Sequence, residues 1–140
     1  MEPLLAVRDL ETQFGAGEQA SLAVRGISFE LYPGETYCLV GESGSGKSVT
    51  GLSMVGLLPD LANHPSGTIT FDPSAREADS PISILDSEKS VLEKLRGSRI
   101  SMIFQEPMTA LNPVQTIGEQ IMETMSLHLG LEAVSYTHLT

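Results

Sequence analysis

Short apolar runs typical of β-strands occupy the first third of the chain. The candidate strands are Leu4–Leu10, Ile27–Leu31 and Thr36–Val40. The second run alternates apolar and polar residues, as in a half-buried strand, and the turn signal Pro33-Gly34 follows it. The third run, TYCLV, is apolar at nearly every position, which predicts a strand buried on both faces. It leads directly into a cluster of glycines.

Beyond the glycine cluster, helical and strand-like spacings alternate. Apolar residues recur at helical spacing from Lys47 until Pro59, which marks the end of a predicted helix. The stretch Asp72–Glu88 is rich in Asp, Ser and Pro, has little periodicity and is predicted to be a surface excursion. Two further strands and a short helix are predicted at Gly67–Phe71, Ile100–Phe104 and Val91–Leu95.

A longer helix is predicted from Thr116. Thr116 and Glu119 form a capping-box pattern, in which each side chain accepts a hydrogen bond from the other residue's backbone N–H. The apolar face of this helix is formed by Ile117, Ile121, Met125 and Leu129. The final residues, 134–140 (VSYTHLT), continue none of these patterns, and we expect them to be a non-native tail.

The composition is that of a soluble globular protein, with 41% hydrophobic and 19% charged residues in a chain of 140. Acidic residues outnumber basic ones by 18 to 8, and the net charge of −10 argues against a nucleic-acid surface, which needs clustered Lys and Arg. We expect a cytosolic location, because no apolar run reaches the ~20 residues of a membrane-spanning helix and the N-terminus lacks signal-peptide features. Cys38 is the only cysteine, so no intrachain disulfide is possible.

The glycine cluster matches the phosphate-loop pattern G-x-x-x-x-G-K-[ST] over residues 41–48, GESGSGKS. Gly41, Gly44 and Gly46 allow backbone conformations closed to other residues and a close approach to a polyphosphate. Successive N–H groups then point inward at the start of the following helix, where an anion is favoured. The alternative is a glycine-rich turn that precedes a lysine by chance.

Two side chains of the loop are candidates for direct roles in phosphate chemistry. Lys47 is placed to reach the β- and γ-phosphates of a nucleotide, and the Ser48 hydroxyl is placed to bind Mg²⁺. We expect Glu42, Ser43 and Ser45 to contribute backbone contacts and not side-chain chemistry.

Residues 100–113, ISMIFQEPMTALNP, resemble the Q-loop region of ABC ATPases, and more narrowly that of the oligopeptide, dipeptide and nickel importer subunits. In that family the strand ends in a Gln whose amide reaches the Mg²⁺ and the attacking water, and Gln105 stands at this position. The stretch GESGSGKSVTGLS from Gly41 and the patterns Leu10–Phe14 and Val24–Phe29 are also similar to these importers. The resemblance covers roughly residues 4–129.

The resemblance implies an α/β fold, namely a P-loop NTPase core of the ABC type with an N-terminal antiparallel β-layer. Residues 1–133 would be the N-terminal part of an ABC ATP-binding domain, with the phosphate loop at 41–48, the Q-loop at about 104–113 and the start of a helical subdomain at 116–130. The family's signature motif, Walker B carboxylates and switch His are not found after Gln105. We therefore expect a truncated domain with unpaired edges and an uncovered apolar face, unable to hydrolyse ATP alone.

The resemblance also assigns residues near the nucleotide base and the α-phosphate. In the family an aromatic residue upstream of the phosphate loop stacks on adenine, and Phe14 is the matching position. The alternative for Phe14 is an ordinary apolar residue on a small β-layer. Val49 stands where a Thr often contacts the α-phosphate, so it would contribute only its backbone N–H.

The expected function is ATP binding with Mg²⁺ and, in the full-length parent, ATP hydrolysis that powers import of peptides or a related solute such as nickel. The partners would be a second, homologous ATP-binding subunit and integral membrane permease subunits, with no nucleic acid, at the inner face of the cell membrane. The alternatives are a soluble ABC ATPase of DNA repair or translation, or a non-functional truncated product. His64, His128 and His138 lack metal-ligand spacing and are expected at the surface or in packing.

Overall fold

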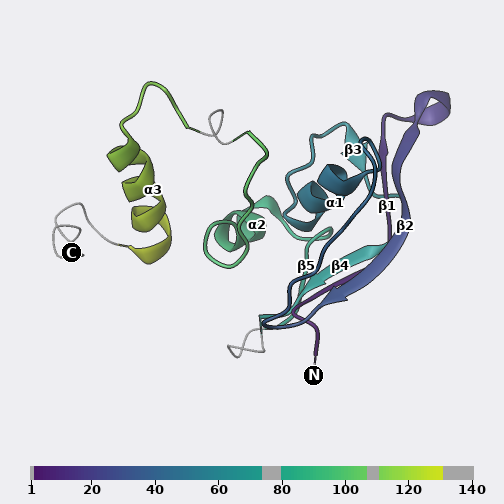
Figure 1. Cartoon of the computed structure of the whole chain (residues 1–140), viewed down its shortest axis with the longest axis horizontal. Helices are drawn as coiled ribbons and strands as arrows, with labels where there is room; N and C mark the ends of the chain where they lie inside the picture. Colours follow the sequence, from purple (N-terminus) through teal and green to yellow (C-terminus); the bar gives the residue numbers. More distant parts are fainter. Residues whose placement is uncertain (1, 74–79, 107–110, 131–140) are drawn as a thin grey trace. The chain divides into compact units, whose positions relative to one another are not determined.

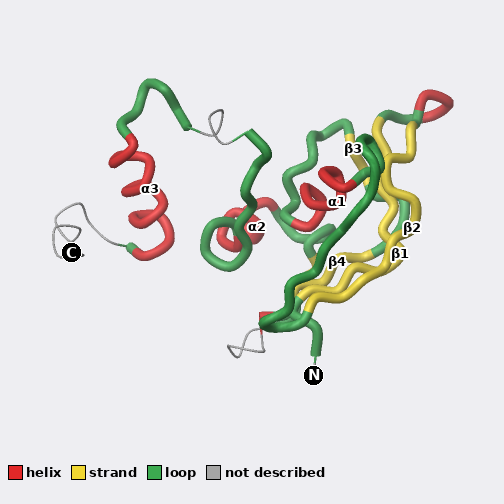
Figure 2. The backbone as a smooth tube through the Cα atoms, viewed as in Figure 1, coloured by secondary structure: helices red, strands yellow, loops and turns green. Residues whose placement is uncertain are grey.

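A five-stranded antiparallel sheet dominates the N-terminal part of the chain (Figures 1 and 2). The computed structural model describes residues 2–73, 80–106 and 111–130, without the side chain of Glu18. The chain divides into two compact units, residues 1–92 and 93–140. The first unit contains the whole sheet and all of the phosphate-loop motif.

The sheet is built around a long hairpin. Its strands β1 (Leu5–Phe14) and β2 (Ser21–Leu31) are joined through a short 3₁₀ turn, η1 (Gly17–Gln19). On its other edge β1 pairs with β3 and β4, and β4 pairs with β5, so the strand order is β2-β1-β4-β5. The shorter strands are β3 (Ala62–Asn63), β4 (Thr68–Phe71) and β5 (Ile82–Ser83). The antiparallel β-layer expected from the sequence is confirmed.

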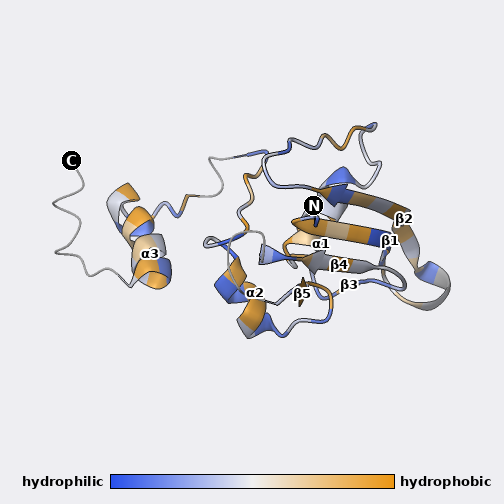
Figure 3. Ribbon diagram, turned by 90° about the horizontal axis from the view of Figure 1, so that it is seen from below, coloured by the Kyte–Doolittle hydropathy of each residue, from blue (hydrophilic) through white to orange (hydrophobic). Residues whose placement is uncertain are grey.

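A bulge in β1 aligns the core of this unit. Val7, Leu10 and Thr12 are completely buried, although simple alternation would put residues 7 and 10 on opposite faces. The register to β2 shifts between Val7 and Leu10, and Asp9 has a φ of 45° at this point. The extra residue of the bulge returns Leu10 and Thr12 to the core face. Apolar residues accordingly concentrate along β1 (Figure 3).

Helix α1 (Lys47–Met54) follows the phosphate loop and lies against the hairpin (Figure 1). Thr50 and Ser53 are buried on the helix, and Val55 is buried directly after it. The helix predicted from Lys47 is thus confirmed, but it ends at Met54 and does not continue to Pro59.

Two predicted strands are wrong. Neither Thr36–Val40 nor Ile100–Phe104 forms a strand, and Ile100 makes only an isolated bridge to Arg96. Their side chains are largely in solvent, with Val40 86% and Ile103 94% exposed. An apolar run shows a tendency to be buried, but a strand also needs a neighbouring backbone to accept and donate its hydrogen bonds. Within the described residues neither run has that neighbour.

The region from Asp72 to Glu88 is not only a surface excursion. It contributes β5 to the sheet, and Ile84, next to that strand, is 2% exposed and part of the core. Its backbone N–H donates to the carbonyl of Ile69 at 2.8 Å, which ties the segment to β4. The central residues 74–79 lie outside the described residues, as do 134–140 of the predicted tail.

Two helices follow, α2 (Lys89–Leu95) and α3 (Ile117–Leu129). The predicted capping box of α3 is confirmed, because Glu119 N–H donates to Thr116 Oγ1 at 3.2 Å and Thr116 N–H donates to Glu119 Oε2 at 2.8 Å. The carboxylate of Glu119 accepts hydrogen bonds from the backbone N–H of Thr116 and from its hydroxyl, and these two bonds, the backbone one first, lower the pKa of Glu119. No residue of α3 is buried, so its predicted apolar face lies open. Among the described residues, no helix is long and apolar enough to cross a membrane.

The capping box predicts how α3 responds to mutation and to acid. Thr116→Ala should destabilise the first turn by about 1 kcal/mol, whereas Thr124→Ala in the middle of the helix should not. The pKa of Glu119 is lower in the folded state, so its ionised carboxylate stabilises the folded helix fully at pH values above the unfolded-state pKa. This stabilisation is lost as the pH falls through the folded-state pKa. Carbon chemical shifts of α3, measured by NMR between pH 7 and pH 3, report both effects. Equal helicity in the two variants would contradict this assignment.

Candidate phosphate-binding site

The phosphate loop is shaped by two glycines that make room for close contacts. A Cβ on Gly46 would lie 2.5 Å from the carbonyl oxygen of Ala23 in β2, and the φ of Gly46 is +89°. A Cβ on Gly41 would lie 2.5 Å from Ser45 Oγ. Real Cβ atoms do not approach backbone atoms so closely, so only glycine at position 46 lets α1 begin against β2. At Gly41 the close atom is the end of the Ser45 side chain, which can rotate away.

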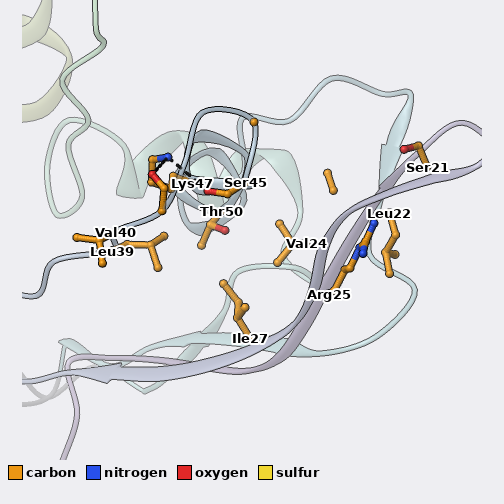
Figure 4. A pocket seen from close by; sticks show the side chains of 13 residues that line it. Ser21, Leu22, Val24, Arg25, Ile27, Leu39, Val40, Ser45, Lys47 and Thr50 are labelled. Atoms are coloured by element: carbon orange, nitrogen blue, oxygen red, sulfur yellow. Dashed lines mark hydrogen bonds between the residues drawn. The ribbon is translucent and has the colours of Figure 1, made fainter.

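Lys47 folds back over the loop. Its Nζ donates to the carbonyl oxygens of Gly41 at 2.6 Å and Glu42 at 2.5 Å, and it lies 3.4 Å from Ser45 Oγ (Figure 4). An ammonium group has three N–H donors. The two short bonds hold the amine over the loop, and the long contact to Ser45 is the weakest of the three. The third donor is therefore the one that a bound anion would take over.

The start of α1 is left uncapped by the protein itself. Gly46 occupies the N-cap position and has no side chain to accept a backbone hydrogen bond, and the first turn contains no acidic residue. The positive end of the helix is therefore not neutralised locally and favours an anionic ligand. The Ser48 side chain is exposed at this end. Thr50 Oγ1 donates to the Gly46 carbonyl at 2.9 Å and thereby fixes the last residue of the loop.

An open cavity of about 750 Å³ lies between β2 and the phosphate loop (Figure 4). Its lining residues are Ser21, Leu22, Ala23, Val24, Arg25, Ile27, Leu39, Val40, Gly41, Gly44, Ser45, Lys47 and Thr50. The charged side chains in this lining are Arg25 and Lys47, and both are cations. In a chain of net charge −10, a cavity lined only by cations and apolar or neutral groups is suited to a polyphosphate.

Some of the residues predicted for the site line this cavity, and others do not. Gly41, Gly44, Ser45 and Lys47 line it, and Glu42, Ser43, Gly46, Ser48 and Val49 belong to the same loop and first helical turn. Phe14 is half-buried at the end of β1 and is not a lining residue, although its strand partner Ser21 is. Gln105 is exposed in the second unit.

Arg25 and Thr50 are site residues that the sequence analysis did not identify. Arg25 lies in β2, remote in sequence from the motif, and only the pairing of β2 with β1 and the approach of Gly46 bring it to the cavity. Thr50 carried no signal beyond its place in a helix. The two histidines in the described ranges are half-buried, as expected for packing, and no cluster of His, Cys, Asp or Glu there could hold a metal ion. His138 is outside those ranges.

A glycine loop that closes around a lysine amine at an uncapped helix start defines the class of phosphate-loop nucleotide-binding proteins. The model of the family described as "ABC transporter" matches residues 24–139. The chain belongs to this family, which confirms the resemblance found in the sequence. The antiparallel sheet with helix α1 fits the expected α/β fold of that family.

Curated relatives of this chain are ATP-binding proteins of transport systems. It is 51% identical over 91% of its length to the peptidoglycan transport ATP-binding protein YejF of Agrobacterium fabrum. It is 44% identical over 94% of its length to the oligopeptide transport protein AppD, and 45% identical over 91% to the dipeptide transport protein DppD, both of Bacillus subtilis. The chain spans 22%, 38% and 36% of the length of these relatives, respectively.

The close approach of Gly46 to β2 leads to a prediction about stability. Gly46→Ala should lower the free energy of unfolding by clearly more than Gly44→Ala. Both glycines have positive φ, which costs an alanine about 1–2 kcal/mol, but only the Cβ at position 46 meets a backbone atom. Urea unfolding followed by circular dichroism measures the difference. If the two variants lose the same stability, the contact with Ala23 does not constrain the loop.

Proposed function

We propose that this chain binds MgATP along residues 41–48. The observation that carries the proposal is the Lys47 amine. Two loop carbonyls hold it beside an uncapped helix start, in a cavity whose charged lining residues are both cations. Phosphoryl groups need positioning and charge neutralisation more than covalent help, and this arrangement provides both. Membership of the ABC transporter family supports the same ligand.

Magnesium would be bound through hydroxyl and amide oxygens. The Ser48 hydroxyl is exposed at the start of α1 beside the loop, and neutral oxygen ligands with phosphate oxygens suit this ion. We assign the second protein ligand to Gln105, on the resemblance of residues 100–113 to the Q-loop. Bound Mg²⁺ would supply charge neutralisation at the β- and γ-phosphates.

The adenine ring would stack on Phe14. Phe14 and Ser21 are directly opposite each other in the β1–β2 hairpin, so their side chains leave the same face of the sheet. Because Ser21 lines the cavity, a base bound near Ser21 would be within reach of Phe14, and this supports the proposal. Val49 would contribute its backbone N–H to the phosphates, as Glu42 and Ser43 would.

In the whole protein, we propose that ATP hydrolysis drives the import of a peptide or a related solute through membrane permease subunits. The support comes from the relatives, which include an oligopeptide and a dipeptide transport ATP-binding protein. The domain would act with a second ATP-binding subunit at the inner face of the membrane. The net charge of −10 favours this assignment over a soluble ABC ATPase that binds nucleic acid.

The role of Lys47 is tested by removing its amine. Lys47→Ala should abolish measurable binding of a fluorescent MgATP analogue to the chain. Each charge-assisted hydrogen bond contributes about 1.5–3 kcal/mol, which is roughly tenfold or more in affinity. Lys94→Ala is the control, because Lys94 is an exposed lysine of α2 that does not line the cavity. Equal affinity of the Lys47→Ala variant and the wild type would rule out this site.

The stacking role of Phe14 is tested by comparing ligands with and without a base. Phe14→Ala should weaken ATP binding by about 1 kcal/mol, roughly fivefold, and leave the affinity for inorganic triphosphate unchanged. Phe14→Tyr keeps an aromatic ring and should bind ATP like the wild type. If Phe14→Ala weakens both ligands equally, its effect is on folding and the base lies elsewhere.

A further inference from the structure

Buried hydroxyl groups connect β1 to α1. Thr12 of β1 and Ser53 of α1 are both 0% exposed, and their oxygen atoms are 3.4 Å apart. Thr12 Oγ1 is also 3.1 Å from Nδ1 of His64, a half-buried residue that follows β3. The same Nδ1 is 3.2 Å from the backbone carbonyl of Glu11. Figure 1 shows α1, β1 and β3 side by side.

Two backbone carbonyls at the ends of this network, those of Glu11 and Val49, determine which group donates in each hydrogen bond. The Glu11 carbonyl can only accept, so Nδ1 of His64 must carry a hydrogen, which it shares with Thr12 Oγ1. Ser53 donates its own hydrogen to the Val49 carbonyl at 2.8 Å. The Thr12 hydrogen is then directed at Ser53 Oγ. The result is one continuous chain from His64 through Thr12 and Ser53 to Val49, which we call the hydroxyl relay.

The hydroxyl relay lies among the apolar side chains of the core. Val7, Leu10 and Ile69 are completely buried in the same unit, and apolar side chains at positions 12 and 53 could fill the space without needing partners. Hydrogen bonds are directional, however, whereas apolar packing tolerates rotation. Helix α1 has only eight residues, so its rotation about its own axis depends on few interactions. The hydroxyl relay is suited to set that rotation.

We propose that Thr12, Ser53 and His64 are positioning residues of the nucleotide site. The relay ends on the carbonyl of Val49, in the same helical turn that presents Lys47 and the backbone N–H groups to the ligand. By fixing this turn against β1, the relay sets the aim of the N–H groups at the phosphates. This inference rests on the proposed binding of MgATP.

The test compares variants that remove or retain the donor at Nδ1. His64→Leu removes it, whereas His64→Asn places an amide N–H where Nδ1–H stood. His64→Leu should weaken binding of fluorescent MgATP and of inorganic triphosphate to a similar extent, by about three- to tenfold, the range of one lost hydrogen bond. His64→Asn should restore both affinities to within about twofold of wild type. Titrations are made well below the melting temperature of each variant, so that every variant is folded.

Thr12→Val and Thr12→Ser provide an independent pair, in case His64→Leu does not fold. Valine keeps the shape of threonine but lacks the hydroxyl, and serine keeps the hydroxyl. If Thr12→Val and His64→Leu melt at lower temperature but bind both ligands like the wild type, the relay is only structural and the proposal is overturned. If the wild type does not bind MgATP, or Lys47→Ala binds it equally well, the proposed function fails and the positioning role fails with it.

Discussion

The close approach of α1 to β2 at Gly46 is the constraint on which the site depends. Because no Cβ separates residue 46 from the Ala23 carbonyl, the helix can begin directly against the strand. This brings the loop, Arg25 and the apolar residues of β2 around one cavity. A larger residue would push the helix start away from β2 and separate Lys47 from Arg25 and the other lining residues of β2. The chemistry of the loop therefore depends on a contact between backbones that no side chain provides.

Features governed by local chemistry could be predicted from the sequence. The phosphate loop, the start of α1 at Lys47 and the capping box of Thr116 and Glu119 each depend on residues close together in the chain, and each is present. Most strands of the sheet were also predicted, although β1 and β2 are longer than expected. Strand β1 continues past its bulge, where Asp9 adopts a positive φ, and the bulge interrupts the simple alternation on which a strand prediction rests.

Features that depend on distant partners could not be predicted. The runs at 36–40 and 100–104 have the composition of buried strands, but neither pairs with a neighbouring strand in the described part of the chain. Tyr37, in the first of these runs, packs on a side chain instead of pairing with a strand: its ring stacks on that of Phe29 at a centroid distance of 5.0 Å. Likewise, nothing in the sequence joins Thr12 to Ser53 and His64, which meet only after the hairpin, α1 and β3 have packed.

The folded-back position of Lys47 affects the entropy of ligand capture. A lysine side chain free in solution loses up to about 2 kcal/mol of rotamer entropy when it is immobilised. Here the protein's own carbonyls, those of Gly41 and Glu42, hold the Lys47 amine in one position. The entropy of ordering this side chain is lost on folding, so it does not reduce the affinity for the ligand. An amine held by the protein's own backbone therefore needs little further ordering to bind a phosphate.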